Sequence, residues 1–201
     1  EPLRDGLVKT EEQRQQIYDV VLRETMRLSR LVNDMLELSR LQSGTASLSR
    51  SVFAPLPLFN LIHETYSAYA EDYQQTFVYD VPEDLPSVWG NPDRTQQVLI
   101  VLLDNAFKYT PEGGVVTLSA CAEGDVVRVR VRDTGVGIPA ADLPHVFDRF
   151  YKVDKSHHSK GTGLGLAIAY EIMKHLGEEM SVTSEPGQGS CFTFTLHIAQ
   201  G

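Results

Sequence analysis

The sequence predicts an α+β protein, a two-layer sandwich in which helices cover one face of a mixed sheet, preceded by a separate helical segment. Three observations predict it. Apolar residues recur at three- and four-residue steps over residues 11–42, which is typical of an amphipathic helix. Valine and arginine alternate over residues 127–132, which indicates a strand with one buried face. Residues 164–176 return to helical spacing directly after a glycine-rich run.

The N-terminal helix carries an apolar stripe that needs a partner surface. Glu24 interrupts the stripe, and Gly44 gives the glycine stop that is common just past helix ends. A helical bundle or a dimer would bury the stripe, and the alternative is that it packs on the chain's own globular domain. We expect residues 1–44 to be a helical-hairpin remnant and residues 45–201 to be a second domain. The stripe consists of Ile17, Val21, Leu28, Leu31, Met35 and Leu38.

The second domain shows an alternation of strand and helix signals. Its helices begin at Pro55 and at Asn91-Pro92-Asp93, because proline at the first turn and asparagine before it are common helix starts. The sheet continues after the turn at residues 111–114. Further strands are expected at residues 47–53, 77–81, 180–184 and 191–198.

The composition excludes several classes of function. The chain has 201 residues and a formal net charge of -9, which argues against a nucleic acid as partner, because phosphate binding needs a basic face. No apolar run approaches the roughly 20 residues that span a bilayer, and no signal-peptide pattern opens the chain. Cys121 and Cys191 lie too far apart in sequence to suggest a metal cluster, and His157 and His158 lack further ligands at metal-site spacing.

Asp133 ends the alternating strand and precedes two glycines. A carboxylate in this position can accept a hydrogen bond from the amino group of adenine. Gly135 and Gly137 would let the backbone approach the ring, because they carry no Cβ. Taken alone, the same residues also fit a simple turn that ends a strand.

A second group lies on one face of the helix that begins near residue 91. Asn105 precedes Lys108 and Tyr109 by three and four residues, so that the three side chains share a face. An amide oxygen is a hard ligand that suits Mg²⁺, while lysine and tyrosine can reach phosphate oxygens. The alternative is a purely structural role, with Asn105 packed and Lys108 extended along the surface.

A third group is the glycine run that leads into the helix at residues 164–176. Amides at the start of a helix favour an anion such as a polyphosphate, and Gly161, Gly163 and Gly165 stand there. The spacing is not the dinucleotide fingerprint, and no GxxxxGK[ST] sequence is present, which excludes a P-loop enzyme. Residues 139–163 lack hydrophobic periodicity and are predicted to form a lid. Phe147, Phe150 and Tyr151 would anchor its base.

Together these motifs resemble those of bacterial sensor histidine kinases of the HisKA type, within the gyrase, chaperone, histidine kinase and MutL ATPase superfamily. The N box of that family resembles residues 93–110, and DTGVGI at 133–138 resembles its G1 box. FDRFY at 147–151 resembles the F box, and GTGLGL at 161–166 resembles the G2 box. Residues 24–44 are similar to the second helix of the dimerisation and phosphotransfer domain. The resemblance covers nearly the whole chain.

The resemblance implies a Bergerat ATP-binding fold with ATP and Mg²⁺ as ligands. Asn105 would hold the metal and act with Lys108 in catalysis, Tyr109 would contact phosphates, and Asp133 would recognise adenine. The γ-phosphoryl group would pass to a histidine of the dimerisation domain and then to an aspartate of a response-regulator receiver domain. The parent would be a homodimer with this part in the cytoplasm beneath a bacterial inner membrane. The other ATP contacts that the resemblance implies are Gly135, Gly137, Ile138, Arg149, Tyr151, Lys152, Gly161, Thr162, Gly163, Leu164, Gly165, Leu166 and Thr193.

Two positions depart from the family pattern. The phosphoacceptor box, a histidine followed by Glu-x-Arg-Thr-Pro, is absent from the sequence, and we expect it upstream of Glu1; His63-Glu64 is a superficial match. The N box usually carries a second asparagine four residues before Asn105, where this chain has Val101. Relatives that hydrolyse ATP have a glutamate there as general base, so Val101 predicts slow hydrolysis. Two alternatives are a nucleotide-binding scaffold without kinase activity and an anti-sigma serine kinase of the same superfamily.

Overall fold

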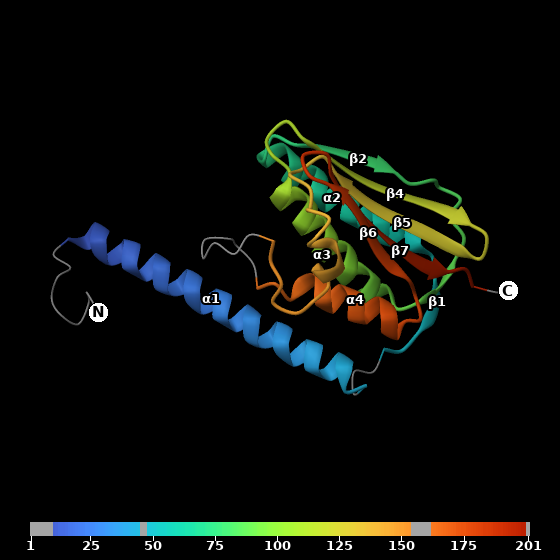
Figure 1. The fold of residues 1–201 in the computed structure, drawn as a ribbon, viewed down its shortest axis with the longest axis horizontal. Helices are drawn as coiled ribbons and strands as arrows, with labels where there is room; N and C mark the ends of the chain where they lie inside the picture. Colours follow the sequence, from blue (N-terminus) through green and yellow to red (C-terminus); the bar gives the residue numbers. More distant parts are fainter. Residues whose placement is uncertain (1–9, 45–47, 154–161, 200–201) are drawn as a thin grey trace.

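The structure, a computed structural model, describes residues 10–44, 48–153 and 162–199. It consists of a long N-terminal helix, α1 (Glu11–Gln42), and a body in which three helices lie against a sheet (Figure 1). Thr10 begins α1 with a capping box, because its hydroxyl accepts a hydrogen bond from the Gln13 amide at 3.2 Å while the Gln13 side chain accepts one from the Thr10 amide. The predicted bounds of this helix are confirmed.

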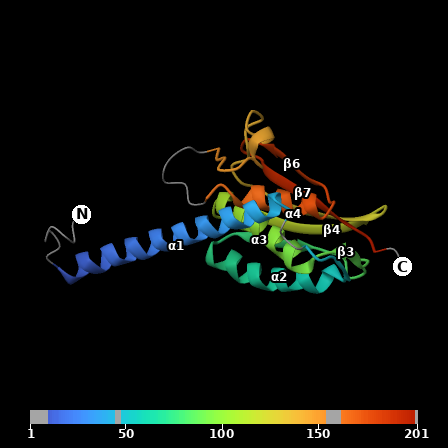
Figure 2. The same cartoon turned by 90° about the horizontal axis from the view of Figure 1, so that it is seen from below.

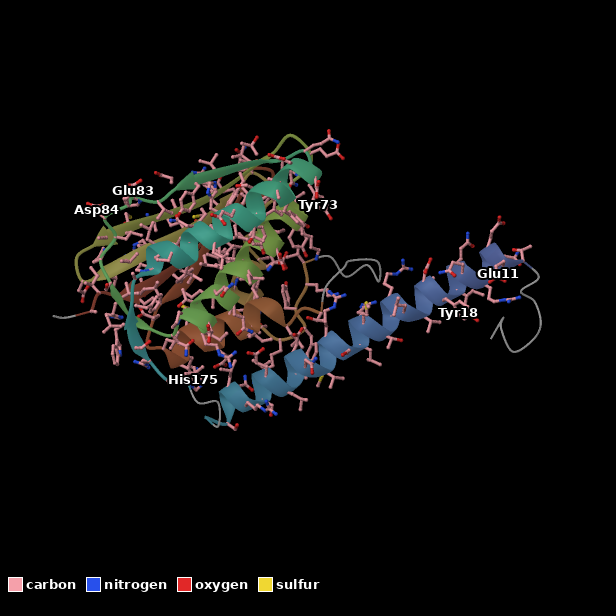
Figure 3. The ribbon with its side chains drawn as sticks, turned by 180° about the vertical axis from the view of Figure 1, so that it is seen from behind. Glu11, Tyr18, Tyr73, Glu83, Asp84 and His175 are labelled. Carbon is pink, nitrogen blue, oxygen red and sulfur yellow. The ribbon has the colours of Figure 1, made fainter. Side chains whose placement is uncertain are left out.

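The apolar stripe of α1 divides into two parts. Leu38 and Leu41 are buried in the same core as the body, so the C-terminal part packs on the chain's own domain. The N-terminal part extends away from the body, with Glu11 and Tyr18 far from it in Figure 3. Leu28 there is 60 % exposed. The alternative of packing on the chain's own domain therefore holds for Leu31, Leu38 and Leu41, whereas Val21, Leu28 and Met35 are exposed. Residues 1–9, the beginning of the predicted helical-hairpin remnant, lie outside the described residues.

The main sheet has five strands in the order β2-β4-β5-β7-β6. β2 runs parallel to β4, and the other neighbours are antiparallel, so the predicted mixed sheet is confirmed. On β5 the valines at 127, 129 and 131 face the core, as their alternation with arginine predicts. The strands are β2 (Thr76–Asp80), β4 (Val115–Glu123), β5 (Val126–Asp133), β6 (Met180–Glu185) and β7 (Gly189–His197).

The helices α2 (Pro55–Asp72), α3 (Pro92–Tyr109) and α4 (Gly165–His175) lie together on one face of this sheet (Figures 1 and 2). The core between the two layers is apolar and includes Phe59, Leu102, Leu118, Ile172 and Phe194, all with relative exposures below 2 %. The α+β, two-layer prediction is therefore confirmed. The arrangement places the C-terminal end of α3, the end of β5 and the start of α4 around one hollow.

The structure differs from the sequence prediction in small elements. The strand expected at residues 47–53 is shorter, β1 (Ser51–Phe53), and residue 47 lies outside the described residues. β1 pairs with β3 (Val88–Gly90), which the sequence did not predict, because three residues between a proline-rich turn and a helix cap show no periodicity. A 3₁₀ turn, η1 (Leu143–His145), lies within the predicted lid. Among the described residues no helix is long and apolar enough to cross a membrane.

Candidate functional site

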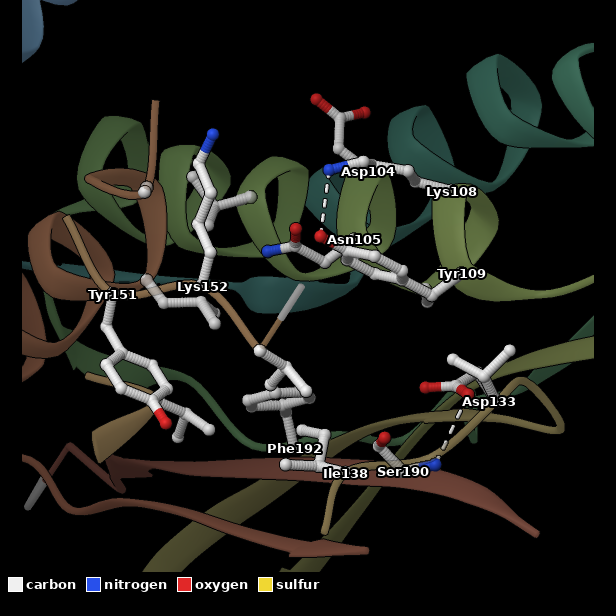
Figure 4. A pocket seen from close by; sticks show the side chains of 18 of the residues that line it. Asp104, Asn105, Lys108, Tyr109, Asp133, Ile138, Tyr151, Lys152, Ser190 and Phe192 are labelled. Carbon is white, nitrogen blue, oxygen red and sulfur yellow. Dashed lines mark hydrogen bonds between the residues drawn. The ribbon is translucent and has the colours of Figure 1, made fainter. Parts of the chain in front are cut away.

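A cavity of about 340 Å³ lies where α3, the end of β5, β7 and the start of α4 meet (Figure 4). Its volume is in the range of small-molecule sites, which is roughly 300–1000 Å³. Most of the residues predicted from sequence line it together. These are Asn105, Lys108, Tyr109, Asp133, Gly137, Ile138, Tyr151, Lys152, Thr162, Gly163, Gly165 and Leu166.

α3 forms the helical wall of the cavity. Asn91 caps its start, because the side-chain oxygen accepts a hydrogen bond from the Arg94 amide at 3.0 Å. The apolar face of α3 is buried against the sheet, which turns Asn105, Lys108 and Tyr109 toward the hollow. Lys108 Nζ donates a hydrogen bond to the Tyr109 hydroxyl at 2.9 Å. A cation and an amide oxygen thus lie on the same wall, as a polyphosphate with a divalent metal would require.

Asp133 lies on the opposite side of the cavity and is only 4 % exposed. Its Oδ1 accepts hydrogen bonds from the amides of Gly135 at 2.8 Å and Ser190 at 3.2 Å. Burial raises the pKa of the Asp133 carboxyl, and the two amide hydrogen bonds oppose that rise. Among the described residues both donors bond to Oδ1, so Oδ2 is available to accept a further hydrogen bond from a ligand.

The glycines after Asp133 are required by close backbone contacts. A Cβ on Gly135 would lie 2.3 Å from the carbonyl oxygen of Tyr109, and a Cβ on Gly137 would lie 2.0 Å from that of Glu185. Gly137 also has φ = +70°, which disfavours residues with a side chain. The Val136 amide donates to the Tyr109 carbonyl at 3.2 Å. The G1 turn is therefore attached directly to the end of α3.

The second part of the predicted lid begins and ends at one point. The Phe150 amide donates to the Gly163 carbonyl at 2.9 Å, so residues 151–162 begin and end side by side. Both residues have left-handed backbones, with φ of +62° for Phe150 and +75° for Gly163. The hydroxyl of Tyr151 donates to Asp142 within the lid. Gly161, together with Lys155, His157, His158 and Lys160, lies outside the described residues.

The start of α4 forms the remaining wall. Gly165 lies against Val101 of α3, and a Cβ on Gly165 would be 3.3 Å from Val101 Cγ1. Before the helix, the Thr162 hydroxyl accepts a hydrogen bond from the Leu164 amide at 3.3 Å and donates one to Asp34 Oδ2 on α1 at 3.0 Å. Gly165 thus packs against α3, and Thr162 is attached to α1.

Several predicted residues lie elsewhere. Arg149 is exposed and lies outside this cavity, in a surface depression with Gln42, Glu171, Lys174 and His175. Leu164 is fully buried in the core, where it anchors the start of α4. Gly135 supports Asp133 through its amide without lining the cavity.

Thr193 also lies away from the cavity. It shares the outer face of β7 with Cys191, whose Sγ is 3.9 Å from the Thr193 hydroxyl. Ser190 and Phe192 line the cavity from β7. Strand alternation puts Phe192 on the inner face with its pairing partner Val131, and Thr193 on the opposite face. The sequence contained this signal, because neighbouring residues of a strand face opposite sides of the sheet, so Phe192 and Thr193 cannot both face the cavity.

Metal-binding groups are sparse in this site. Among the described residues there is no group of three or more His, Cys, Asp or Glu side chains that could hold a metal ion. Asn105 contributes an amide oxygen from α3 to the cavity. Such a donor fits Mg²⁺, which usually keeps several waters and takes its other ligands from phosphates.

Comparisons with known proteins match two parts of the chain separately. Residues 90–200 match the family of histidine kinase-, DNA gyrase B- and HSP90-like ATPases, and residues 1–44 match the His kinase A (phospho-acceptor) domain. The chain is 37% identical over 200 residues to sensor histidine kinase WalK of Bacillus subtilis, covering 98% of this chain and 33% of WalK. It is 37% identical over 188 residues to adaptive-response sensory kinase SasA of Thermosynechococcus vestitus, covering 92% and 49%. The chain therefore spans a third to a half of these relatives.

Solved structures show the same architecture. Full-length ShkA in complex with AMPPNP is similar with a TM-score of 0.81 and 32% identity, covering 96% of this chain and 41% of ShkA. Histidine kinase AdeS of Acinetobacter baumannii shares the fold with a TM-score of 0.78 and 24% identity, covering 99% and 91%. Because the ATPase family matches more than half of its length, this chain belongs to the histidine kinase-, DNA gyrase B- and HSP90-like ATPases, as the catalytic domain of a HisKA-type histidine kinase.

Proposed function

We propose that this chain is the kinase core of a two-component sensor, which binds Mg-ATP in the α3–β5–α4 cavity and transfers the γ-phosphoryl group to a protein histidine. The observation that supports this proposal is that the buried carboxylate of Asp133 faces the amide of Asn105 and the ammonium of Lys108 across one cavity. These are the groups that a purine at one end and a metal polyphosphate at the other would need.

Recognition of adenine is assigned to Asp133. Its Oδ2 would accept a hydrogen bond from the exocyclic amine, while Oδ1 stays fixed by the Gly135 and Ser190 amides. Ile138 and Phe192 supply apolar surface for the ring from the sheet side (Figure 4). A guanine, which has a carbonyl oxygen where adenine has this amine, would place an acceptor against a carboxylate and leave both unpaired.

The phosphates are assigned to the α3 wall and the lid base. Asn105 would hold Mg²⁺, which compensates the phosphate charge when it is bound. Lys108, Tyr109 and Lys152 lie on the same cavity and would contact phosphate oxygens. Amides at the start of α4, next to Gly163 and Gly165, would bind the remaining oxygens.

For the transfer step the chain's task is positioning. Imidazole is itself an adequate nucleophile, so the site needs to hold the γ-phosphoryl group in line with it and to exclude water. Val101 lines the cavity in the position where hydrolytic relatives carry a glutamate. An aliphatic side chain cannot take a proton from water, which favours transfer over hydrolysis.

The remaining assignments concern the parent protein. We propose that residues 1–44 belong to the dimerisation and phosphotransfer domain, that residues 45–201 form the catalytic domain, and that the exposed stripe of α1 is buried by a second copy. The phosphoryl group would then pass to the receiver domain of a response regulator. We place the parent at a bacterial inner membrane, with this part on the cytoplasmic side.

Calorimetry tests the nucleotide assignment. Mg-ADP should bind the wild-type chain, Asp133→Ala should remove binding of both ADP and adenosine, and Asn105→Ala should remove the magnesium dependence. Unchanged uptake in both variants would reject this site. A scaffold without nucleotide affinity predicts no heat of binding in any of the three proteins.

Transfer is tested by supplying a dimerisation domain with an intact acceptor box in trans, together with radiolabelled ATP. A phosphohistidine is labile in acid and stable in alkali, whereas a phosphoserine shows the reverse. Acid-labile label on the added domain supports the proposal. Acid-stable label would instead support the serine kinase alternative.

A further inference from the structure

The end of α3 carries Lys108 and Tyr109, and how this end is held determines where the phosphate-binding groups lie. The last four carbonyls of a helix lack partners within the helix. In α3 the Ala106 carbonyl accepts from the Thr110 hydroxyl at 2.7 Å, and the Tyr109 carbonyl accepts from the Val136 amide at 3.2 Å. The first bond lies within the helix end itself, and the second ties it to the G1 turn.

A third contact comes from Gln75, in the turn between α2 and β2. Its Nε2 donates to the Phe107 carbonyl at 3.0 Å and also to the Thr110 carbonyl. One amide nitrogen therefore spans the last turn of α3, with one acceptor on each side of Lys108 and Tyr109. Neither Phe107 nor Thr110 touches the cavity, whereas the two residues between them line it.

Gln75 is itself rigidly placed. Its backbone amide donates to the Ala70 carbonyl at the end of α2 at 2.9 Å. The preceding Gln74 has φ = +53°, and its carbonyl accepts from the Gly113 amide at 2.8 Å. The side chain therefore extends from a turn that is fixed on both sides, and it joins the end of α2 to the end of α3.

The orientation of the Gln75 amide is unambiguous. Two carbonyl oxygens face Nε2, and turning the amide over would direct Oε1 at both of them. In the observed orientation Oε1 is buried and has no hydrogen-bond partner among the described residues. A buried unpaired oxygen is unfavourable, so the arrangement satisfies the α3 carbonyls at the expense of the glutamine's own oxygen.

We propose that Gln75 is a positioning residue for the phosphate end of the cavity: it holds the last turn of α3, and through that turn Lys108 and Tyr109. This inference rests on the proposed nucleotide function. Gln75 touches no ligand, because it lies outside the cavity lining. Its loss should therefore affect the phosphate contacts and spare the adenine contacts at Asp133, which stands on β5.

The test compares two ligands on the same proteins. Gln75→Met keeps the length of the side chain and removes its donors. We expect the Kd for Mg-ADP to rise about tenfold, because small misplacements of contacting groups are expensive, while the Kd for adenosine changes by less than about twofold. Gln96→Met is the matched control: the same exchange on α3, at a side chain that makes no hydrogen bond with any residue that the structure describes. It should leave both constants unchanged.

The possible outcomes separate the two proposals. A wild-type chain that fails to bind Mg-ADP overturns the proposed function and this inference with it. The second outcome is that the wild-type chain binds Mg-ADP and Gln75→Met either weakens the binding of ADP and adenosine equally or weakens neither. That result overturns this inference alone. Should Gln75→Met fail to fold, Gln75→Lys and Gln75→Glu give the same comparison. The ammonium can donate to both carbonyls and should retain ADP affinity, whereas the carboxylate should lose it. Equal ADP affinity in this pair would also overturn the inference.

Discussion

Asp34 on α1 accepts a hydrogen bond from the hydroxyl of Thr162 in the glycine run, with 3.0 Å between Oδ2 and Oγ1. The two residues are 128 positions apart in the sequence and join the N-terminal helix to a residue that lines the cavity. Glu37, one turn further along α1, accepts from Arg94 and Gln97 of α3. α1 is therefore attached to α3 and to the segment that leads into α4.

The first prediction concerns this contact. Asp34→Ala should speed amide hydrogen exchange at residues 162–166 by about fivefold, because one net hydrogen bond contributes roughly 1 kcal/mol. Exchange in β4 and β5 should stay unchanged. Asp19→Ala is the control, since Asp19 lies on the exposed part of α1 and accepts only from Gln15 among the described residues. Equal exchange at 162–166 in all three proteins would contradict the coupling.

A second prediction uses two glycines with the same backbone and different surroundings. Gly113 and Gly137 have φ of +76° and +70°, but a Cβ meets nothing within 4 Å at Gly113 and lies 2.0 Å from the Glu185 carbonyl at Gly137. Gly113→Ala should lower the free energy of unfolding by about 1 kcal/mol through backbone strain alone. Gly137→Ala should lower it by roughly 3 kcal/mol or more, because overlap adds to strain.

Urea denaturation measures both glycine variants, with midpoint and slope recorded separately. Gly137→Ala should also weaken Mg-ADP binding, since the G1 turn cannot keep its position against Glu185. Gly113→Ala should bind as the wild type does. Two variants of equal stability would show that the contact at Gly137 relaxes freely.

The elements with strong periodicity were predictable, and the short or interface-dependent ones were not. α1, the valine-arginine alternation of β5 and the helix after the glycine run all follow from period 3.6 or period 2. β3 has only three residues, which is too short for a hydrophobic pattern to be recognised. The division of the α1 stripe depends on which turns meet α4, and that is a property of tertiary packing rather than of the helix itself.

The candidate site shows the same limit. Motif spacing brought Asn105, Asp133 and Gly163 together correctly, because each belongs to a turn or a helix face whose local geometry the sequence defines. Arg149 lies in a surface depression outside the cavity, although it belongs to the same motif as Tyr151, which lines the cavity. Gln75 carries no motif, and its contacts with α3 arise only once α2 and α3 pack together.

A third prediction distinguishes the two faces of β7. Ser190→Ala should weaken adenosine binding a few-fold, because Ser190 lines the cavity and its hydroxyl lies 3.0 Å from that of Ser184, which in turn accepts from the Ile138 amide. Thr193→Ala should have no effect, since Thr193 is on the outer face. Competition against a fluorescent nucleotide measures both. A loss of affinity in Thr193→Ala with none in Ser190→Ala would reverse the assignment.

A fourth prediction concerns hydrolysis. Val101 offers no general base, so steady-state ATP hydrolysis by the isolated chain should stay well below about one turnover per second, under the roughly 1–1000 s⁻¹ typical of enzymes. Asn105→Ala should abolish whatever hydrolysis remains, which separates it from a contaminating ATPase. Many turnovers per second that depend on Asn105 would mean that another group activates water.

A fifth prediction follows from the raised pKa of Asp133. Burial favours the neutral carboxyl, so protonation begins at a higher pH than the usual value of about 3.9. Adenine recognition needs the carboxylate as acceptor, and adenosine affinity should therefore fall as the pH drops through this raised pKa. Adenosine is the suitable probe because it has no phosphate to titrate.

The sign of the linkage separates this loss of binding from acid unfolding. The folded state of a carboxyl with a raised pKa binds a proton more tightly than the unfolded state does, so protonating Asp133 stabilises the fold rather than weakening it. Binding should thus be lost while circular dichroism still reports a folded chain. Asp133→Asn keeps a side-chain oxygen that does not titrate, and its weaker binding should be independent of pH over the same range. A wild-type affinity that falls only together with the circular dichroism signal would assign the pH dependence to unfolding and not to Asp133.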